Sequence, residues 1–245
     1  TMDAAKLKAA ADLLGAGGDT PLVYGREKAL AYLTGRGQGR QGRLVILCPN
    51  HTGLGGALAM MGSGVWRTPL GDAAIDEALA AALAHALPEL ADDESAHRFE
   101  HSLEVQLPFI QRQKPEARFV PVCVGTANLA LLLRLGDALA AAVTAAGEPV
   151  LLVASSDMTH YESAQNARRK DTLAVERMEA LDPEGLAAVV RRESISMCGW
   201  APAVAVMQAC RKLGATRGRL IRYATSGDVT GDQSSVVGYA GVAFV

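Results

Sequence analysis

Short apolar runs that end in polar turns recur along the chain. Residues 43–48 (RLVILC), 118–126 (RFVPVCVGT) and 149–160 (PVLLVASSDMTH) each begin with the length and composition of a buried strand. Two further runs, 219–228 (RLIRYATSGD) and 235–245 (SVVGYAGVAFV), predict strands that close the chain. Each run except the last is followed by loop-forming residues, so the pattern indicates strands separated by longer connections.

Stretches with helical composition and spacing lie between these runs. Asp182 and Pro183 are typical of an N-cap and a first helical position. Because strands alternate with helices, the pattern predicts one α/β domain with a mostly parallel sheet. The predicted helices cover residues 3–14, 73–87, 101–112, 127–146, 162–181, 182–193 and 203–213.

Composition narrows the class of protein. The 245 residues include 24 Lys and Arg against 26 Asp and Glu, so no basic excess points to nucleic acid. No apolar run approaches the roughly 20 residues of a membrane span, and the start shows no secretory signal. The four cysteines are far apart and form no CxxC pair, which favours reduced thiols and a cytoplasmic location.

Polar side chains follow three of the predicted strands. Ligands of open α/β sheets bind outside the carboxyl ends of the strands. The candidates are Pro49, Asn50 and His51 after the first strand, Ser155, Ser156, Asp157 and His160 after 150–154, and Thr225, Ser226 and Asp228 after RYA. We therefore expect groups able to bind a metal or move a proton at one edge of the sheet.

Each candidate also has a simpler explanation. His51 could only hydrogen-bond the backbone of its loop. Asp157 and His160 are three residues apart and could face one small volume, but Asp157 or Ser156 could instead cap the next helix. His85 and His97 have no partner pattern, so the sequence predicts surface positions for both.

Cys198 differs from the other cysteines because its segment, ISMCGW, lies outside any apolar run. A cysteine in a polar loop beside histidines is expected to have thiolate character, as a metal ligand or nucleophile does. Cys48 and Cys123 lie in predicted strands, and Cys210 lies at helical spacing, so all three are expected in the core.

The segment FEHSLEVQLPF carries Glu100, His101 and Glu104, which could share one helix face. We expect Asn50, Glu100 and His101 to contact substrate. The alternative is a first helical turn in which carboxylates are favoured by the helix dipole.

Seven ordered blocks in residues 43–245 resemble the Memo family, and more narrowly its bacterial and archaeal members called AmmeMemoRadiSam system protein B. The resemblance implies a single three-layer α/β/α domain with a central, mostly parallel (mixed) sheet. Such a domain is typical of LigB-type class III extradiol dioxygenases, which use non-haem iron. The blocks are CPNHTG, WRTPLGD, EHSLEVQLPF, PVCVGT, ASSDMTHY, ISMCGW and SGDVTGDQSSVVGYAG.

The resemblance also implies roles for individual residues. His51 and Cys198 match family positions that line a metal site, while Asp157 and His160 complete the pocket. The family's opening His-Ala-Gly-Tyr segment is missing, so residues 1–42 form a shortened, divergent entry segment. LVYG at 22–25 is its nearest match and places Asp19 near the absent histidine.

These implications lead to three hypotheses. A non-haem iron site needs about three protein ligands, and Asp157 or Asp19 could join His51 and Cys198, with His160 as acid and base. The first hypothesis is thus a metal-dependent oxidoreductase with iron, or with copper or zinc. The second is a zinc-type hydrolase using the same residues. The third is a degenerate site that binds a small molecule or peptide. The family name also suggests a pathway shared with a radical SAM protein and an AMMECR-type protein.

Overall fold

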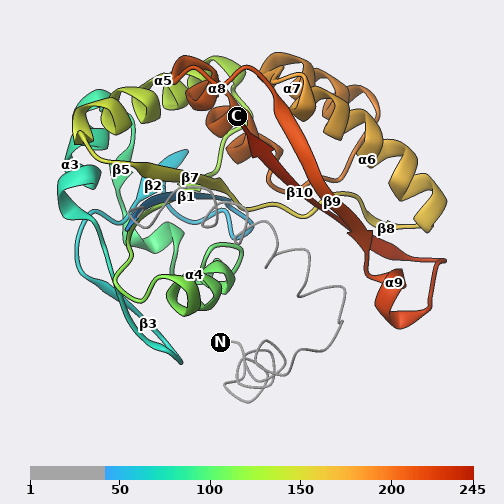
Figure 1. Ribbon diagram of the computed structural model, residues 1–245, viewed down its shortest axis with the longest axis horizontal. Coiled ribbons are helices and arrows are strands. Elements are labelled where there is room, and N and C mark those ends of the chain that lie inside the picture. The colour runs from blue at the N-terminus through green and yellow to red at the C-terminus, as the bar shows by residue number, and fades with distance from the viewer. Residues whose placement is uncertain (1–41) are drawn as a thin grey trace.

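The computed structural model describes residues 42–245. The predicted helix at 3–14 and Asp19 lie outside the described residues. In the described part, most predicted strands and helices are present, and they form the layered α/β arrangement that the alternating pattern indicates (Figure 1).

A five-stranded sheet lies at the centre of the fold. Its strand order is β5 (Ala91–Asp92), β2 (Leu58–Met60), β6 (Arg118–Val124), β1 (Arg43–Pro49) and β7 (Val150–Ala154). β1 pairs in parallel with both β6 and β7, whereas β2 runs antiparallel to β6. The sheet is therefore mixed, and its three longest strands are parallel.

The two closing strands do not continue this sheet. β9 (Gly218–Thr225) and β10 (Val236–Phe244) pair antiparallel, and β8 (His160–Glu162) joins the other edge of β10. The connection between β9 and β10 contains only the short helix α9 (Gly227–Thr230). Neighbouring strands joined this closely pair as a hairpin, because a parallel pair needs a longer crossover. Our expectation that residues 225–228 follow a strand of the main sheet is wrong.

The helices match the predicted stretches with shifted starts. The predicted helix at 73–87 begins later because Ala73 belongs to a hairpin, and Asp76 caps the helix by accepting from the Leu79 amide. The hairpin consists of β3 (Val65–Thr68) and β4 (Gly71–Ala74). The helices are α3 (Glu77–Ala86), α4 (Leu107–Gln113), α5 (Leu129–Ala146), α6 (Ala164–Glu179), α7 (Pro183–Arg192) and α8 (Trp200–Lys212), with 3-10 turns at Glu94–Ala96 and Glu104–Gln106.

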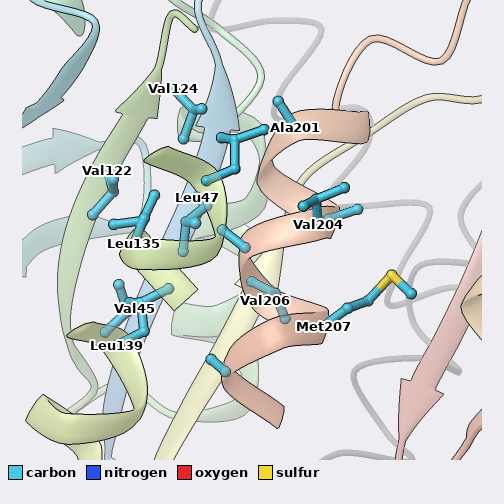
Figure 2. Packing of buried hydrophobic residues seen from close by; sticks show 14 of the residues in the cluster. Val45, Leu47, Val122, Val124, Leu135, Leu139, Ala201, Val204, Val206 and Met207 are labelled. Carbon is cyan, nitrogen blue, oxygen red and sulfur yellow. The ribbon is translucent and has the colours of Figure 1, made fainter. Parts of the chain in front are cut away.

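Side chains of the central strands alternate between two cores. Val45 and Leu47 of β1 pack into the cluster beneath α5 and α8, while Leu44 and Ile46 point to the opposite face. Figure 2 shows the first cluster, in which labelled side chains of β1, β6, α5 and α8 gather on one face of the sheet. On the other face, α4 contributes two buried side chains to the second cluster. Helices thus cover both faces, as a three-layer α/β/α domain requires (Figure 1).

Helix α5 has 18 residues and a mean hydropathy of 1.7, so by length and composition it could cross a membrane. In this fold it is a core helix, with Leu132, Leu135 and Leu139 fully buried. Gly136 lets it approach α8 closely, since a Cβ there would lie 2.6 Å from Gln208.

His97 is buried, contrary to the surface position that the sequence predicts, whereas His85 is exposed. His97 is 7% exposed, and its ring meets Trp66 edge-on at 5.5 Å. Neither ring nitrogen has a hydrogen-bond partner within the described residues. Burial lowers the pKa of His97 to about 4, against the opposing effect of Asp93 and Glu100.

We expect His97 to make stability depend on pH. Its folded pKa of about 4 lies below the ordinary 6.5, so the unfolded chain binds more protons between these values. Stability from the neutral ring is therefore present above pH 6.5 and is lost as the pH falls. Between pH 7 and pH 5 this effect should lower the free energy of unfolding by about 2 kcal/mol.

Urea unfolding of wild type and His97→Phe at both pH values measures this contribution. The phenyl ring keeps the contact with Trp66 but cannot take up a proton, so the variant should lose this part of the pH dependence. His85→Gln, at an exposed position, is the control and should keep it. Identical pH dependence in wild type and His97→Phe would contradict the assignment.

Candidate functional site

The loops after β1 and β7 leave the sheet side by side. Leu47 pairs with Ala154 at the carboxyl ends of these parallel strands, and the Ser155 amide donates to the Leu47 carbonyl at 2.8 Å. The polar segments that begin at Asn50 and at Ser155 therefore start from one edge, as the sequence predicts.

Asn50 shapes the loop after β1. Its Oδ1 accepts from the Gly53 amide at 2.8 Å, and its Nδ2 donates to the Leu54 carbonyl at 2.7 Å. Thr52 donates its hydroxyl to the same Oδ1 at 3.1 Å. Both polar ends of Asn50 are thus engaged within its own loop, and its role as a substrate contact stays a prediction.

His51 is anchored by Glu100. Its Nδ1 lies 2.9 Å from Glu100 Oε1, and its backbone amide donates to Oε2 at 2.6 Å. Burial opposes ionisation of Glu100, but hydrogen bonds from His51 and Ser102 outweigh burial and lower the pKa of Glu100 to about 2. An ionised carboxylate only accepts, so His51 Nδ1 carries the proton. The His51 side chain is 53% exposed, and in the neutral imidazole with its proton on Nδ1 the lone pair lies on Nε2.

Buried polar contacts join the His51 loop to the loop after β7. Ser102 donates to Glu100 Oε1 from its amide and its hydroxyl, at 3.0 and 2.7 Å. Ser155 donates its hydroxyl to the Ser102 carbonyl at 2.6 Å and accepts from Gln106 Nε2 at 3.0 Å. Local sequence pattern does not single out Ser102 or Gln106, and the one signal for them is their place in the block EHSLEVQLPF.

Cys198 lies against the loop after β7. The Asp157 amide points at Cys198 Sγ at 3.1 Å, and the Gly199 amide donates to Ser156 Oγ at 2.9 Å. Burial raises the pKa of the Cys198 thiol, an effect that the Asp157 amide only partly offsets. In this arrangement burial therefore opposes the thiolate character that the sequence predicts for Cys198. Cys48 and Cys123 are fully buried in their strands, as predicted.

Asp157 and His160 face each other, with 3.9 Å between Asp157 Oδ2 and His160 Nε2. His160 is held from behind by Ser196, whose carbonyl lies 2.8 Å from Nδ1 and whose hydroxyl accepts from the His160 amide. A carbonyl only accepts, so Nδ1 carries the proton and Nε2 faces the carboxylate. The alternative that Asp157 or Ser156 caps α6 is wrong, because the cap is Ser163.

His101 and Glu104 pair with each other on the surface, with 2.7 Å between His101 Nδ1 and Glu104 Oε1. Glu100 turns the opposite way, into the interior. The prediction that the three residues share one helix face is therefore wrong. The segment is not helical at Glu100, because the 3-10 turn begins only at Glu104. Contact of substrate with His101 stays a prediction.

The site therefore combines four segments: the loops after β1 and β7, residues 100–102, and the turn at Cys198. Among residues 42–245 no three His, Cys, Asp or Glu side chains form a group that could hold a metal ion. Within these segments, His51 offers an imidazole nitrogen beside Glu100, and Cys198 offers a thiol beside the Asp157 amide.

Gly199 lets the Cys198 turn approach the loop after β7, and we expect Gly199→Ala to disrupt that approach. The added Cβ would lie 2.2 Å from the Ser155 carbonyl oxygen and 2.5 Å from Ser156 Cβ. The free energy of unfolding should fall by roughly 2 kcal/mol in urea titrations. Gly42→Ala, whose Cβ meets nothing within 4 Å, is the control. Equal stability of both variants would contradict the close packing.

Comparisons with known proteins concern the family and the fold of the chain. The family model described as Memo-like protein matches residues 21–243. MEMO1 family protein MK0963 of Methanopyrus kandleri is 46% identical over 202 residues, covering 82% of this chain and 71% of that protein. MEMO1 family protein MTH_45 of Methanothermobacter thermautotrophicus is 44% identical over 202 residues, covering 82% and 73%.

A solved structure shares the fold. The uncharacterized protein JW3007 of Escherichia coli K12 superposes with a TM-score of 0.52 at 16% identity, covering 88% of this chain and 91% of that one. At this identity the likeness concerns the fold alone. The match of the family model over nearly the whole chain, with these relatives, shows that the chain belongs to the Memo-like protein family.

Proposed function

We propose that this chain is a non-haem metal-dependent oxidoreductase related to class III extradiol dioxygenases, in which His51 and Cys198 are metal ligands. The observation that carries the proposal is the His51–Glu100 contact. Metal-binding histidines typically donate their second ring N–H to a carboxylate, which orients the ring and makes the free nitrogen a better ligand. His51 has this arrangement, and its side chain is 53% exposed.

The donor chemistry is compatible with iron, copper or zinc, and iron is the metal that we propose. An imidazole nitrogen and a thiolate sulfur both bind first-row transition metals. Asp157 is the candidate third ligand within the described residues, and Asp19 is the candidate outside them. A metal bound here would supply Lewis-acid and redox chemistry.

Proton transfer is assigned to His160 and Asp157. His160 is fixed through Nδ1 by the Ser196 carbonyl, so its Nε2 can accept a proton from a bound substrate. Asp157 Oδ2, at 3.9 Å, would stabilise the imidazolium that results. The pair then returns the proton from the same nitrogen. Glu100 keeps its charge throughout, since its pKa is about 2.

A second function is favoured by one specific observation. The described residues do not assemble three metal donors at one point, and this is the arrangement expected of a site that has lost metal binding. In that case the same pocket residues would hold a small molecule or a peptide. A zinc-type hydrolase would use the same His51 and Cys198. The identity of the bound metal, rather than the residues, therefore distinguishes a hydrolase from an oxidoreductase.

Metal binding tests the proposal directly. Protein purified anaerobically should bind about one equivalent of Fe²⁺, measured by elemental analysis after removal of free metal. His51→Ala and Cys198→Ala should abolish this binding because each removes a ligand. Glu100→Gln should weaken it by about 10–100-fold, since the carboxylate only orients His51.

His85→Ala is the matched control, because His85 is an exposed histidine on α3 outside the site. Equal loss of metal in His85→Ala and His51→Ala would mean that binding is adventitious. Absence of stoichiometric metal in the wild type, with Fe²⁺, Cu⁺ and Zn²⁺ each tried, would overturn the proposal in favour of the ligand-binding module.

A further inference from the structure

Asp171 is a buried carboxyl group that the proposed site does not use. It lies on α6 and is 0% exposed. Its Oδ1 accepts from the Thr159 amide at 2.9 Å, and its Oδ2 accepts from the Tyr223 hydroxyl at 2.7 Å. A buried carboxyl is unfavourable unless such donors satisfy it. Asp171 therefore ties three parts of the chain together: α6, β9, and the segment between β7 and β8.

The tied segment is held on its other side by β10. The Met158 amide donates to the Gly238 carbonyl at 2.9 Å, and the Gly238 amide donates to the Thr159 carbonyl at 2.8 Å. Both Met158 and Thr159 are buried. Asp171 and Gly238 thus fix the backbone of residues 158–159, which are the two residues between Asp157 and His160.

The approach of β10 to Asp171 requires a glycine. A Cβ on Gly238 would lie 2.1 Å from Asp171 Oδ2. Any side chain there would push the carboxyl group away or separate β10 from residues 158–159. The carboxyl, the glycine and the tied segment therefore form one packed unit.

The groups around Asp171 affect the pKa of its carboxyl in opposite directions. Burial raises the pKa of Asp171, while hydrogen bonds from Thr159 and Tyr223 oppose that rise. Arg168 places its guanidinium 4.8 Å from the centre of the Tyr223 ring, and Glu162 adds negative charge nearby. The contacts that position Asp171 come from the Thr159 amide and the Tyr223 hydroxyl.

We propose that Asp171 is a positioning residue that sets Asp157 against Cys198 and His160 against Asp157. It acts through the Thr159 amide, at the middle of the four-residue span that carries both groups. The importance of this role for a reaction rests on the proposed function. The positioning itself concerns only this chain and can be tested without metal or turnover.

Alanine in place of Asp171 could not accept from the Thr159 amide. The backbone of residues 158–159 would then keep its hydrogen bonds with Gly238 of β10 but lose the one to α6. His160 would gain freedom to leave Ser196 and turn its ring outward. Its side chain is 22% exposed in the present arrangement, so modification of the ring should report the change.

Diethyl pyrocarbonate, which acylates unprotonated imidazole nitrogen, is the probe, with mass spectrometry of His160 and His85 in the same sample. Asp171→Ala should raise the modification rate of His160 by about tenfold, the ratio that corresponds to one net hydrogen bond. The rate at exposed His85 should not change. Each variant is measured well below its unfolding temperature.

Two variants separate positioning from general stability. Asp171→Asn keeps an oxygen for the Thr159 amide and should restore a rate within about twofold of wild type. Tyr223→Phe removes the other hydrogen bond of the same carboxyl but leaves the Thr159 contact, so His160 should again react at nearly the wild-type rate. An unchanged His160 rate in Asp171→Ala, or an equal rise at His85 and His160, would overturn the proposal.

Amide hydrogen exchange of the wild type provides a test that needs no variant. The Thr159 amide should exchange as slowly as the Gly238 amide, because both are buried donors of the same unit. Rapid exchange at Thr159 alone would contradict the hydrogen bond from its amide to Asp171. Failure of Fe²⁺ binding with the His160 pattern intact would remove the proposed function and leave the positioning role standing.

Discussion

The parallel pairing of β1 with β7 is the constraint on which the rest of the site depends. It aligns Leu47 with Ala154, so both strands reach the same edge of the sheet in the same direction, and β1 continues to Pro49. The pairing is stable because alternate side chains of β1 enter two separate hydrophobic clusters. A shift by one residue would exchange the two faces and bury neither set correctly. Register in the core therefore determines where His51 and Asp157 can lie.

Buried polar contacts then turn this proximity into a defined geometry. Glu100 lies in the interior, where an ionised carboxylate is stable only if several donors converge on it. His51 supplies two of these donors and Ser102 supplies two more. Ser155 continues the network to the loop after β7. The requirement to satisfy one buried charge therefore determines the shape of two loops and the orientation of the exposed histidine.

The sequence predicts those parts of the site that follow directly from local pattern. His51 and Asp157 come immediately after apolar strands, and the topology of parallel sheets indicates that such positions converge. Helical spacing predicts Glu100 near the site but places it on a helix, which is wrong. The contact that places Glu100 is with His51, 49 residues away, and no local periodicity reveals it. No pattern marks Asp171 at all, since its partners Thr159 and Tyr223 are 12 and 52 residues away.

The same limit explains the errors in the fold. The runs that form β9 and β10 have the composition of buried strands, and composition does not say which sheet a strand joins. Their short connection is the physical reason for antiparallel pairing. His97 has an ordinary local sequence, and only packing of the β3–β4 hairpin brings Trp66 against its ring. When a residue such as His97 is buried by an element distant in the sequence, the local sequence around it shows no hydrophobic pattern that would predict the burial.

Both site histidines are held through Nδ1, but their acceptors differ, and this difference supports different roles. His51 donates to a buried, ionised carboxylate, which increases electron density on Nε2 and favours coordination of a cation. His160 donates to the neutral Ser196 carbonyl, while its Nε2 faces the Asp157 carboxylate. A carboxylate on that side would stabilise a proton that arrives at Nε2. Under the proposed function, these surroundings suit His51 to metal binding and His160 to proton transfer.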